Sequence, residues 1–253
     1  MDSGESSGTP QISDALIEDF VTRLNDLDDH LKYDTSPEAV GAWLQHMNVE
    51  PEELVDIIHR DIPVSMQTSF NLSKDGDGNF ECQMQERQNR AGMASRTFDI
   101  PNKFVVHELF ELARTHRGQG LGRTFIRNWV HIYLEHWQIE NVLVLAGLSH
   151  GGYVWLRYGF VPDQNSWEAL RSTVRRRLIE KMAEIDNVVF DIASDTLEKD
   201  DPQSAWIIAD LAEPIDGQSL GRYLLKDTKW SGELDLTDEV ALNRLLRYVG
   251  ELK

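Results

Sequence analysis

The sequence predicts an α/β fold in which a mixed, twisted central sheet is flanked by helices on both faces. Phe104 to Leu112 is rich in Val, Phe and Leu, a composition typical of a buried strand. From Phe125 to Trp137 large apolar residues recur at helical spacing, and Asn141 to Leu148 is a second apolar run. A strand, a loop, an amphipathic helix and a second strand in this order are typical of α/β proteins.

The composition limits the class of protein. Of the 253 residues 41% are hydrophobic, which is enough for the core of one large domain or of a domain with added parts. No apolar stretch is long enough to span a bilayer, and the polar residues 1–10 predict a disordered tail rather than a signal peptide. The single cysteine, Cys82, excludes an internal disulfide. We therefore expect a cytoplasmic protein with no membrane partner.

The charge balance is strongly acidic. The formal net charge is -18, from 43 acidic and 25 basic residues. Such a field repels nucleic acid and favours a cationic partner. High solubility alone is an equally good interpretation of the same charge.

Helical patterns fill the chain before the sheet. Apolar residues from Ile12 to Tyr33 follow a helical period behind Ser13, a residue type that caps helices. Two further helices are predicted at Pro37 to Met47 and at Pro51 to His59, because proline is favoured in the first turn of a helix. Residues 11–63 are therefore expected to form a helical N-terminal segment.

A hairpin and a short strand come next. Val64 to Leu72 and Asn79 to Gln85 alternate apolar and polar residues on either side of a turn rich in Gly and Asp. The turn also resembles a calcium loop, but Phe80 stands where such a loop requires glycine, so we expect no metal there. Arg87 to Gly92 is a polar break before a short strand near Ser95 to Ile100.

The long strand predicted at Phe104 to Leu112 places alternate residues on opposite faces of the sheet. Glu108 then shares a face with Val106 and Phe110, and Glu111 shares the other face with His107. Each face thus carries one carboxylate among apolar neighbours. His107 is expected to be a packed or surface histidine.

A glycine-rich loop follows this strand. Gly118, Gly120 and Gly122 stand at alternate positions, where glycine lets the backbone turn tightly and approach a ligand closely. The free N–H groups at the start of the next helix favour an anion such as a pyrophosphate. The loop lacks the third glycine of the dinucleotide fingerprint and the lysine of the P-loop, so it predicts a phosphate-binding turn of another kind.

Two motifs resemble those of the GNAT superfamily, the acyl-coenzyme A-dependent N-acetyltransferases. The first is Arg117 to Gly122, and the second is the Gly159-Phe160 pair at the end of a predicted helix. The resemblance covers about residues 64–162. It implies a GNAT-like fold that binds acetyl-coenzyme A or another acyl-coenzyme A and transfers the acyl group by direct attack of an amine on a cationic small molecule or protein.

The resemblance also implies which residues hold the coenzyme. Main-chain N–H groups of the loop would bind the pyrophosphate, the strand end would bind the pantetheine arm, and two arginines would add positive charge. The residues expected to bind the coenzyme are Leu112, Arg117, Gly118, Gln119, Gly120, Leu121, Gly122 and Arg123.

Catalysis requires a base for the attacking ammonium and an acid for the departing thiolate. In the superfamily the base is often a glutamate on the strand before the glycine loop, a place that Glu108 and Glu111 match. We favour Glu108 because its apolar neighbours would raise its pKa, although either acid could instead be salt-bridged or exposed. Trp155 stands where many relatives have the acid tyrosine, and Tyr153 is the nearest substitute that we consider.

The rest of the chain departs from the superfamily pattern. An amphipathic helix near residues 166–185 carries an arginine cluster that could bind an anion or pair with the protein's own carboxylates. Val188 to Ala193 and Ala205 to Leu211 are expected to be the last strands of a core spanning residues 64–212. The remaining C-terminal extension, residues 213–253, could form a homodimer contact.

Three functions remain open on the sequence alone. The first is N-acyl transfer, and the second is an interaction or regulatory role in a GNAT-like protein with weak or no activity, which Trp155 favours. The third is acyl transfer to a hydroxyl or a nucleobase, which the acidic charge disfavours.

Overall fold

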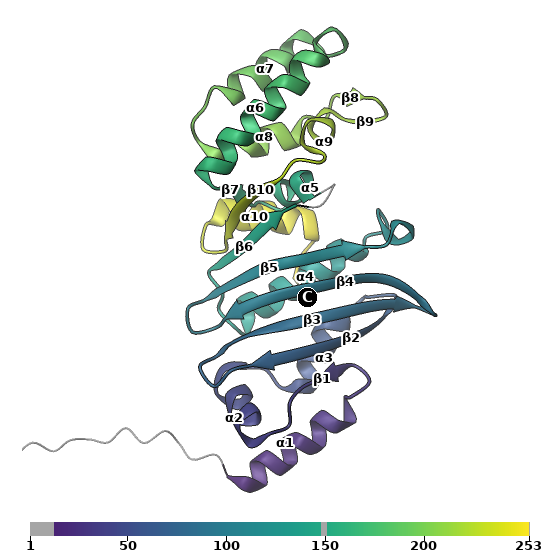
Figure 1. The fold of residues 1–253 in the computed structure, drawn as a ribbon, viewed down its shortest axis with the longest axis vertical. Helices are drawn as coiled ribbons and strands as arrows, with labels where there is room; N and C mark the ends of the chain where they lie inside the picture. Colours follow the sequence, from purple (N-terminus) through teal and green to yellow (C-terminus); the bar gives the residue numbers. More distant parts are fainter. Residues whose placement is uncertain (1–12, 148–150, 253) are drawn as a thin grey trace, which may run out of the picture.

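The computed structural model describes residues 13–147 and 151–252 and has a mixed α/β fold built on one large twisted sheet (Figure 1). Most neighbouring strands are antiparallel, and β5 and β6 are parallel. The strands of this sheet, in spatial order, are β1 (Leu31–Lys32), β2 (Ser65–Leu72), β3 (Asp77–Glu86), β4 (Asn89–Asp99), β5 (Phe104–Leu112), β6 (Asn141–Ala146), β10 (Trp230–Asp235) and β7 (Val161–Pro162).

Helices pack on the sheet and extend beyond its β7 edge (Figure 1). A separate two-stranded sheet is formed by β8 (Pro214–Ile215) and β9 (Gln218–Ser219). The helices are α1 (Asp14–Asp26), α2 (Pro37–His46), α3 (Pro51–His59), α4 (Leu121–Glu135), α5 (Gly151–Arg157), α6 (Gln164–Glu180), α7 (Asn187–Leu197), α8 (Ala205–Asp210), α9 (Leu220–Leu225) and α10 (Glu239–Val249). The α/β class predicted from the sequence is confirmed by this mixed sheet and the helices that flank it.

The N-terminal helices form largely as predicted. Ser13 accepts a hydrogen bond from the N–H of Leu16, and Ser36 accepts one from the N–H of Ala39, so each caps its helix. The first helix is shorter than expected, because α1 ends at Asp26. Leu31 is instead buried in β1, which pairs in parallel with β2.

The hairpin between β2 and β3 is confirmed, and Gly76 takes the left-handed φ of +88° that its turn requires. The polar break expected at Arg87 to Gly92 is wrong. Glu86 pairs with Asn89, so Arg87 and Gln88 alone make the turn and β4 begins at once. Arg87 has a φ of 57°, which shows that a non-glycine residue occupies the tight turn.

One part of the hydrophobic core lies between the sheet and one layer of helices, and another part lies among α6, α7, α8 and α9. The fully buried Trp129 of α4 stacks on Phe80 of β3 with ring centroids 4.0 Å apart. Asn128 of the same helix donates hydrogen bonds to the carbonyls of Ile58, at 3.1 Å, and Arg60, at 2.7 Å, which ties α4 to the end of α3.

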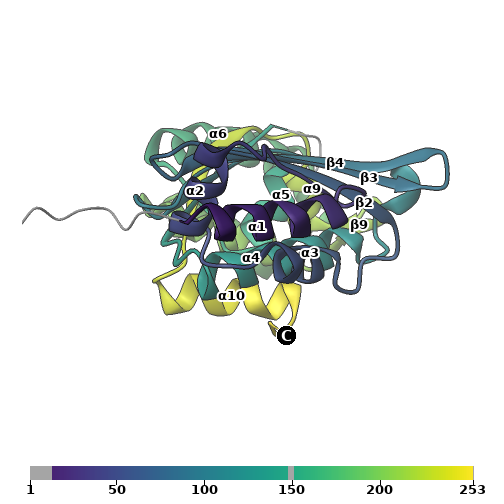
Figure 2. The same ribbon diagram turned by 90° about the horizontal axis from the view of Figure 1, so that it is seen from below.

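Helices were expected on both faces of the sheet, and this is wrong for its N-terminal strands. Figure 2 shows α1, α3, α4 and α10 on one side of β2 to β4. On the other side, alternate side chains of β2 and β3 are exposed to solvent. An antiparallel sheet tolerates one solvated face because that face carries polar residues, here mainly Gln, Asn, Ser and Glu.

The strands expected at Val188 to Ala193 and Ala205 to Leu211 are wrong, because these segments form α7 and α8. Asp186 starts α7 by accepting hydrogen bonds from the N–H groups of Val188 and Val189. The sheet is completed instead by β7 and by β10, which lies between β6 and β7. The segment 213–253 therefore contributes an internal strand of the sheet.

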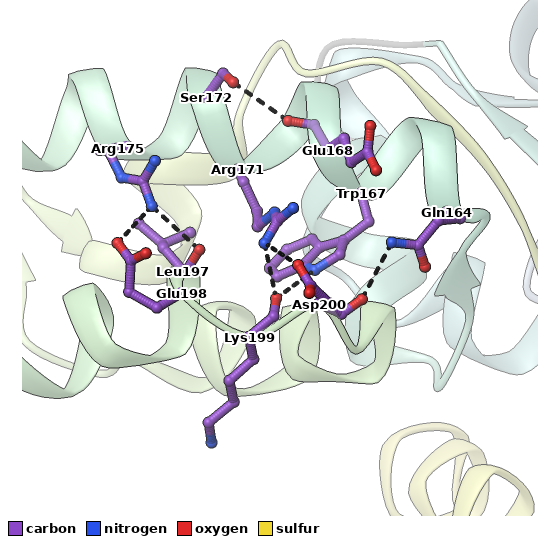
Figure 3. Close-up of polar contacts among 10 residues, drawn as sticks. All are labelled: Gln164, Trp167, Glu168, Arg171, Ser172, Arg175, Leu197, Glu198, Lys199 and Asp200. Carbon is purple, nitrogen blue, oxygen red and sulfur yellow. Dashed lines mark hydrogen bonds and ion pairs between the residues drawn. The ribbon is translucent and has the colours of Figure 1, made fainter.

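The arginines of α6 pair mainly with groups of the protein itself. Arg171 pairs with Asp200 at 3.0 Å and Arg175 with Glu198 at 2.7 Å, both in the loop after α7 (Figure 3). Arg176 pairs with Glu180, and Arg177 donates to two main-chain carbonyls. Of the two readings, pairing with the protein's own groups accounts for the cluster.

Across residues 13–147 and 151–252, no helix combines the length and apolar character needed to cross a membrane. The polar tail expected at residues 1–10 lies outside the described part of the chain.

Candidate functional site

A pocket of about 400 Å³ opens where two parallel strands separate. Phe104 of β5 pairs with Asn141 of β6, and the pairing ends at His107 opposite Val144, although both strands continue. The gap is bounded by the glycine loop and the start of α4 on one side and by α5 on the other. Most of the residues expected to form the site therefore converge on one place.

A β-bulge in β5 changes which side chains face the pocket. Ser95 of β4 pairs with Leu109, and the next residue of β4, Arg96, pairs with His107, so Glu108 is the extra residue. Phe110 consequently lies on the same face as His107, where its ring stacks on Phe125 of α4 at 5.2 Å. Glu108 lies on the face opposite His107 as expected, but the strict alternation expected along this strand is wrong from Leu109 onward.

The bulge also removes the reason for favouring Glu108 as a buried base. Its side chain is exposed and accepts hydrogen bonds from the hydroxyls of Thr97, at 2.6 Å, and Ser95, at 3.3 Å. Glu111 forms a salt bridge with Arg90 at 3.0 Å. Both glutamates line the pocket, but neither has the apolar surroundings that the sequence implied.

The glycine loop presents main-chain groups to the pocket. Gly118 and Gly120 have φ values of 77° and 88°, and a Cβ at either would meet no described atom within 4 Å. Gly120 caps α4, and no described side chain bonds to the free N–H groups of the first turn. Gly122 packs against Phe110 and Leu112 instead, and a Cβ added at this position would lie 3.3 Å from the phenyl ring.

Three arginines line the pocket, and no described carboxylate pairs with any of them. Arg117 donates from Nε to the carbonyl of Leu112 at 2.8 Å, which fixes its stem against the end of β5. Arg123 lies over the ring of Tyr248 at 5.6 Å. Arg222 reaches the pocket from α9.

Two of the expected coenzyme-binding residues do not line the pocket. The Gln119 amide donates to the carbonyl of Thr115 at 2.6 Å, so its side chain is used to close the loop. Leu121 is buried at the start of α4 and packs in the core. Their side chains therefore stabilise the loop, and only their main-chain groups are available to a ligand.

Aromatic side chains form the wall on the α5 side. Trp155 is buried with its ring edge-to-face on His107 at 5.5 Å. Tyr153 lines the pocket and accepts a hydrogen bond from Arg157 at 3.2 Å. Tyr158 also lines it and packs on Tyr248 at 4.7 Å, and burial raises the pKa of Tyr158 well above its usual value.

Sequence reasoning missed Arg222 and Tyr248, which belong to segments far along the chain. Both reach the pocket because α9 and α10 pack against α5. The local sequence around Tyr248 gives no signal for this role.

The described residues contain no cluster of three or more His, Cys, Asp or Glu side chains that could hold a metal ion. Cys82 is buried in β3, and burial raises the pKa of its thiol to about 11, so it is a poor nucleophile there. The groups that converge on the pocket are main-chain N–H groups, arginines and aromatic rings, a set suited to an organic phosphate with an apolar arm.

No protein-family model and no curated protein matches the sequence. Among solved structures, the crystal structure of nourseothricin acetyltransferase is similar, with 19% identity and a TM-score of 0.29. The similarity covers 34% of this chain and 51% of that chain, so the match spans about half of the neighbour's length. This similarity is too low to support a function, so any function has to be inferred from the residues of the pocket.

Proposed function

We propose that the protein binds an acyl-coenzyme A in the pocket between β5 and β6 and transfers the acyl group to an amine. The observation that supports this is the convergence of the N-terminus of α4, where no described side chain bonds to the free N–H groups, with Arg117, Arg123 and Arg222 in a protein of net charge -18. The three arginine side chains are exposed and have no described carboxylate partner, so they are available to phosphates, which also accept hydrogen bonds from the free N–H groups.

The described residues divide the work of holding the donor. The N–H groups near Gly118 and Gly120 and the three arginines bind the phosphates, and the unpaired edge of β5 from Glu108 to Leu112 offers hydrogen bonds to the pantetheine arm. The thioester supplies an activated acyl group. The pocket then has to orient an amine in its neutral form and to stabilise negative charge as the sulfur departs.

Glu108 remains the candidate base, acting from the solvent side of the sheet. Its bonds to Thr97 and Ser95 hold the carboxylate at the bulge, beside the opening of the pocket. An exposed acid can accept the proton of an incoming ammonium directly or through one water. The acidic charge of the protein favours a cationic acceptor at this opening. Glu111 and Tyr153 line the same pocket and are the secondary candidates for proton transfer.

The first test is calorimetric titration of the native chain and of Gly120→Glu with acetyl-coenzyme A. The substitution puts a negative charge at the phosphate end of the pocket, so we expect native binding and a loss of at least about tenfold in the variant. The matched control is Gly217→Glu. Gly217 also has a left-handed φ, 74°, and open space around it, but lies in the β8–β9 turn away from the pocket.

The acceptor is then sought by measuring free thiol released from acetyl-coenzyme A with spermidine, an aminoglycoside and a lysine-rich peptide. Failure of the native chain to bind acetyl-coenzyme A would refute the proposal. Binding without thiol release from any amine would favour the alternative of an interaction or regulatory protein, which Trp155 at the expected acid position also favours.

A further inference from the structure

A patch of apolar side chains lies in the middle of the large sheet. Leu145 of β6 is 65% exposed, although β6 is an internal strand between β5 and β10. Val106 of β5 pairs with Leu143 of β6, and both are half-buried, as is Leu109 of β5. We call Val106, Leu109, Leu143 and Leu145 the apolar patch. Exposed apolar side chains that gather in this way, with polar groups around them, mark ligand-binding surfaces.

The register of the strands places the apolar patch on the face of the sheet opposite α4, which we call the open face. Val144 pairs with His107, and the His107 ring contacts α4, so these two residues face that helix. Leu145 follows Val144 in β6 and therefore points to the open face. Leu109 shares that face, since its partner Ser95 precedes the residue that pairs with His107.

The pocket joins the two faces of the sheet. Leu112 and Gly122 line it from the side of α4, and Leu145 lines it from the open face. The pairing of β5 with β6 ends at His107, so the pocket passes through the gap beyond that residue. A donor held by its phosphates at the start of α4 would present its acyl group at this gap, which leaves the open face for the acceptor.

Carboxylates flank the apolar patch. Glu108 lines the pocket on the open face and accepts hydrogen bonds from two hydroxyl groups. Glu233 of β10 is exposed and pairs with Leu143, so it shares the face of the patch. Neither carboxylate forms an ion pair with a described residue. Negative charge on two sides of an apolar surface repels phosphate and attracts an ammonium group that carries an apolar substituent.

We propose that the acceptor is a primary amine with an apolar group, such as an aromatic ring, within about two carbons of its nitrogen, and that Leu145 determines this specificity. The inference rests on the proposed acyl transfer and names the class of amine that it uses. The ammonium lies at Glu108, beside the gap, and the apolar group covers Leu145. A polyamine or an aminoglycoside would satisfy the carboxylates but would leave the leucine exposed to water.

The test first compares two amines that differ in this feature. 2-Phenylethylamine and ethanolamine each carry a primary amine two carbons from the variable group, which is a phenyl ring in one and a hydroxyl in the other. Thiol release from acetyl-coenzyme A should give the native chain a kcat/KM at least about tenfold higher for 2-phenylethylamine.

Leu145→Thr then tests the residue itself. Threonine suits a strand but removes most of the apolar surface. The kcat/KM for 2-phenylethylamine should fall about tenfold, while the kcat/KM for ethanolamine and the affinity for acetyl-coenzyme A stay within about twofold of the native values. The matched control is Val188→Thr, because Val188 is also 65% exposed but belongs to α7 and does not line the pocket. It should leave all three values unchanged.

The outcomes separate this inference from the proposed function. If the native chain does not bind acetyl-coenzyme A, or releases no thiol with any amine, both fail. Equal kcat/KM values for the two amines, or an equal fall for both in Leu145→Thr, would overturn the specificity alone. So would a Leu145→Thr chain that loses activity with octanoyl-coenzyme A but keeps its preference for 2-phenylethylamine, because the patch would then hold the acyl chain of the donor.

Discussion

Gly159 packs against α10 directly after Tyr158, a residue that lines the pocket. It has a φ of 94°, and a Cβ built on it would lie 2.7 Å from the carbonyl oxygen of Ala241 in α10. That oxygen belongs to the helix backbone and cannot turn aside. Gly159→Ala therefore combines two costs, a left-handed backbone for a residue with a Cβ and a clash with a packed helix.

The two costs can be sized separately. A left-handed conformation costs an L-residue about 1–2 kcal/mol, and overpacking in a core costs about 1–3 kcal/mol more. We expect Gly159→Ala to lower the free energy of unfolding by about 2–5 kcal/mol. Gly217→Ala carries a left-handed φ of 74° with open space around it, so it should lose only the first part.

The assay is urea unfolding of both variants and of the native chain, followed by tryptophan fluorescence. With a slope of about 2 kcal/mol per molar urea, the clash alone should separate the two variant midpoints by roughly 0.5–1.5 M. Equal losses in the two variants would refute the claim that α10 packs directly on Gly159. It would also weaken the placement of Tyr248 in the pocket, because the same helix carries it.

Three further changes test the pocket and the buried residues Arg96 and His107, which pair across β4 and β5. Arg96→Met removes a buried cation that has no carboxylate partner. It should raise the free energy of unfolding by about 1–4 kcal/mol, measured by thermal or chemical unfolding. A large decrease would mean that the contacts of Arg96 with the aromatic rings more than offset the cost of removing its charge from water. The folded-state pKa of His107 lies below the unfolded value of about 6.5, so its contribution to stability is present above that pH and is lost as the pH falls. The free energy of unfolding should drop by up to about 1.4 kcal/mol per pH unit below 6.5. In His107→Gln the free energy of unfolding should depend less steeply on pH in this range. Arg222→Ala should weaken acetyl-coenzyme A binding roughly tenfold and reduce its dependence on salt, and an unchanged affinity would exclude Arg222 from the phosphate end of the pocket.

Local sequence signals predicted the parts of the fold that local chemistry determines. Ser36 before Pro37 and the proline at position 51 set the starts of α2 and α3, and the glycine turn near Gly76 set the β2–β3 hairpin. These features depend on capping and on backbone preference, which act within a few residues. The same holds for the glycine loop, where the start of α4 at Leu121 follows directly from Gly120 as its cap.

The prediction of which side chains share a face along β5 failed because it ignored the pairing of β5 with β4. Alternation placed Glu108 beside Phe110, but the bulge opposite Ser95 and Arg96 moves Phe110 to the face of His107 and leaves Glu108 exposed on the other face. A bulge arises when two strands adjust their register, so it depends on β4 as much as on β5. The buried-base argument for Glu108 failed for this reason, while His107, treated as a packed residue, lies at the pocket.

The pocket arginines could be recognised only in part from the acidic residues near them in the sequence. Arg117, Arg123 and Arg222 have no acidic residue three or four positions away, whereas Arg23 has Asp19 and Arg176 has Glu180, and both of these pairs form. Arg127 also lacks such a neighbour, yet it pairs with Asp61 from a distant segment. The absence of a local partner is therefore not sufficient to identify an arginine that is free to bind phosphate, and only the fold tells which of these arginines meet at one pocket.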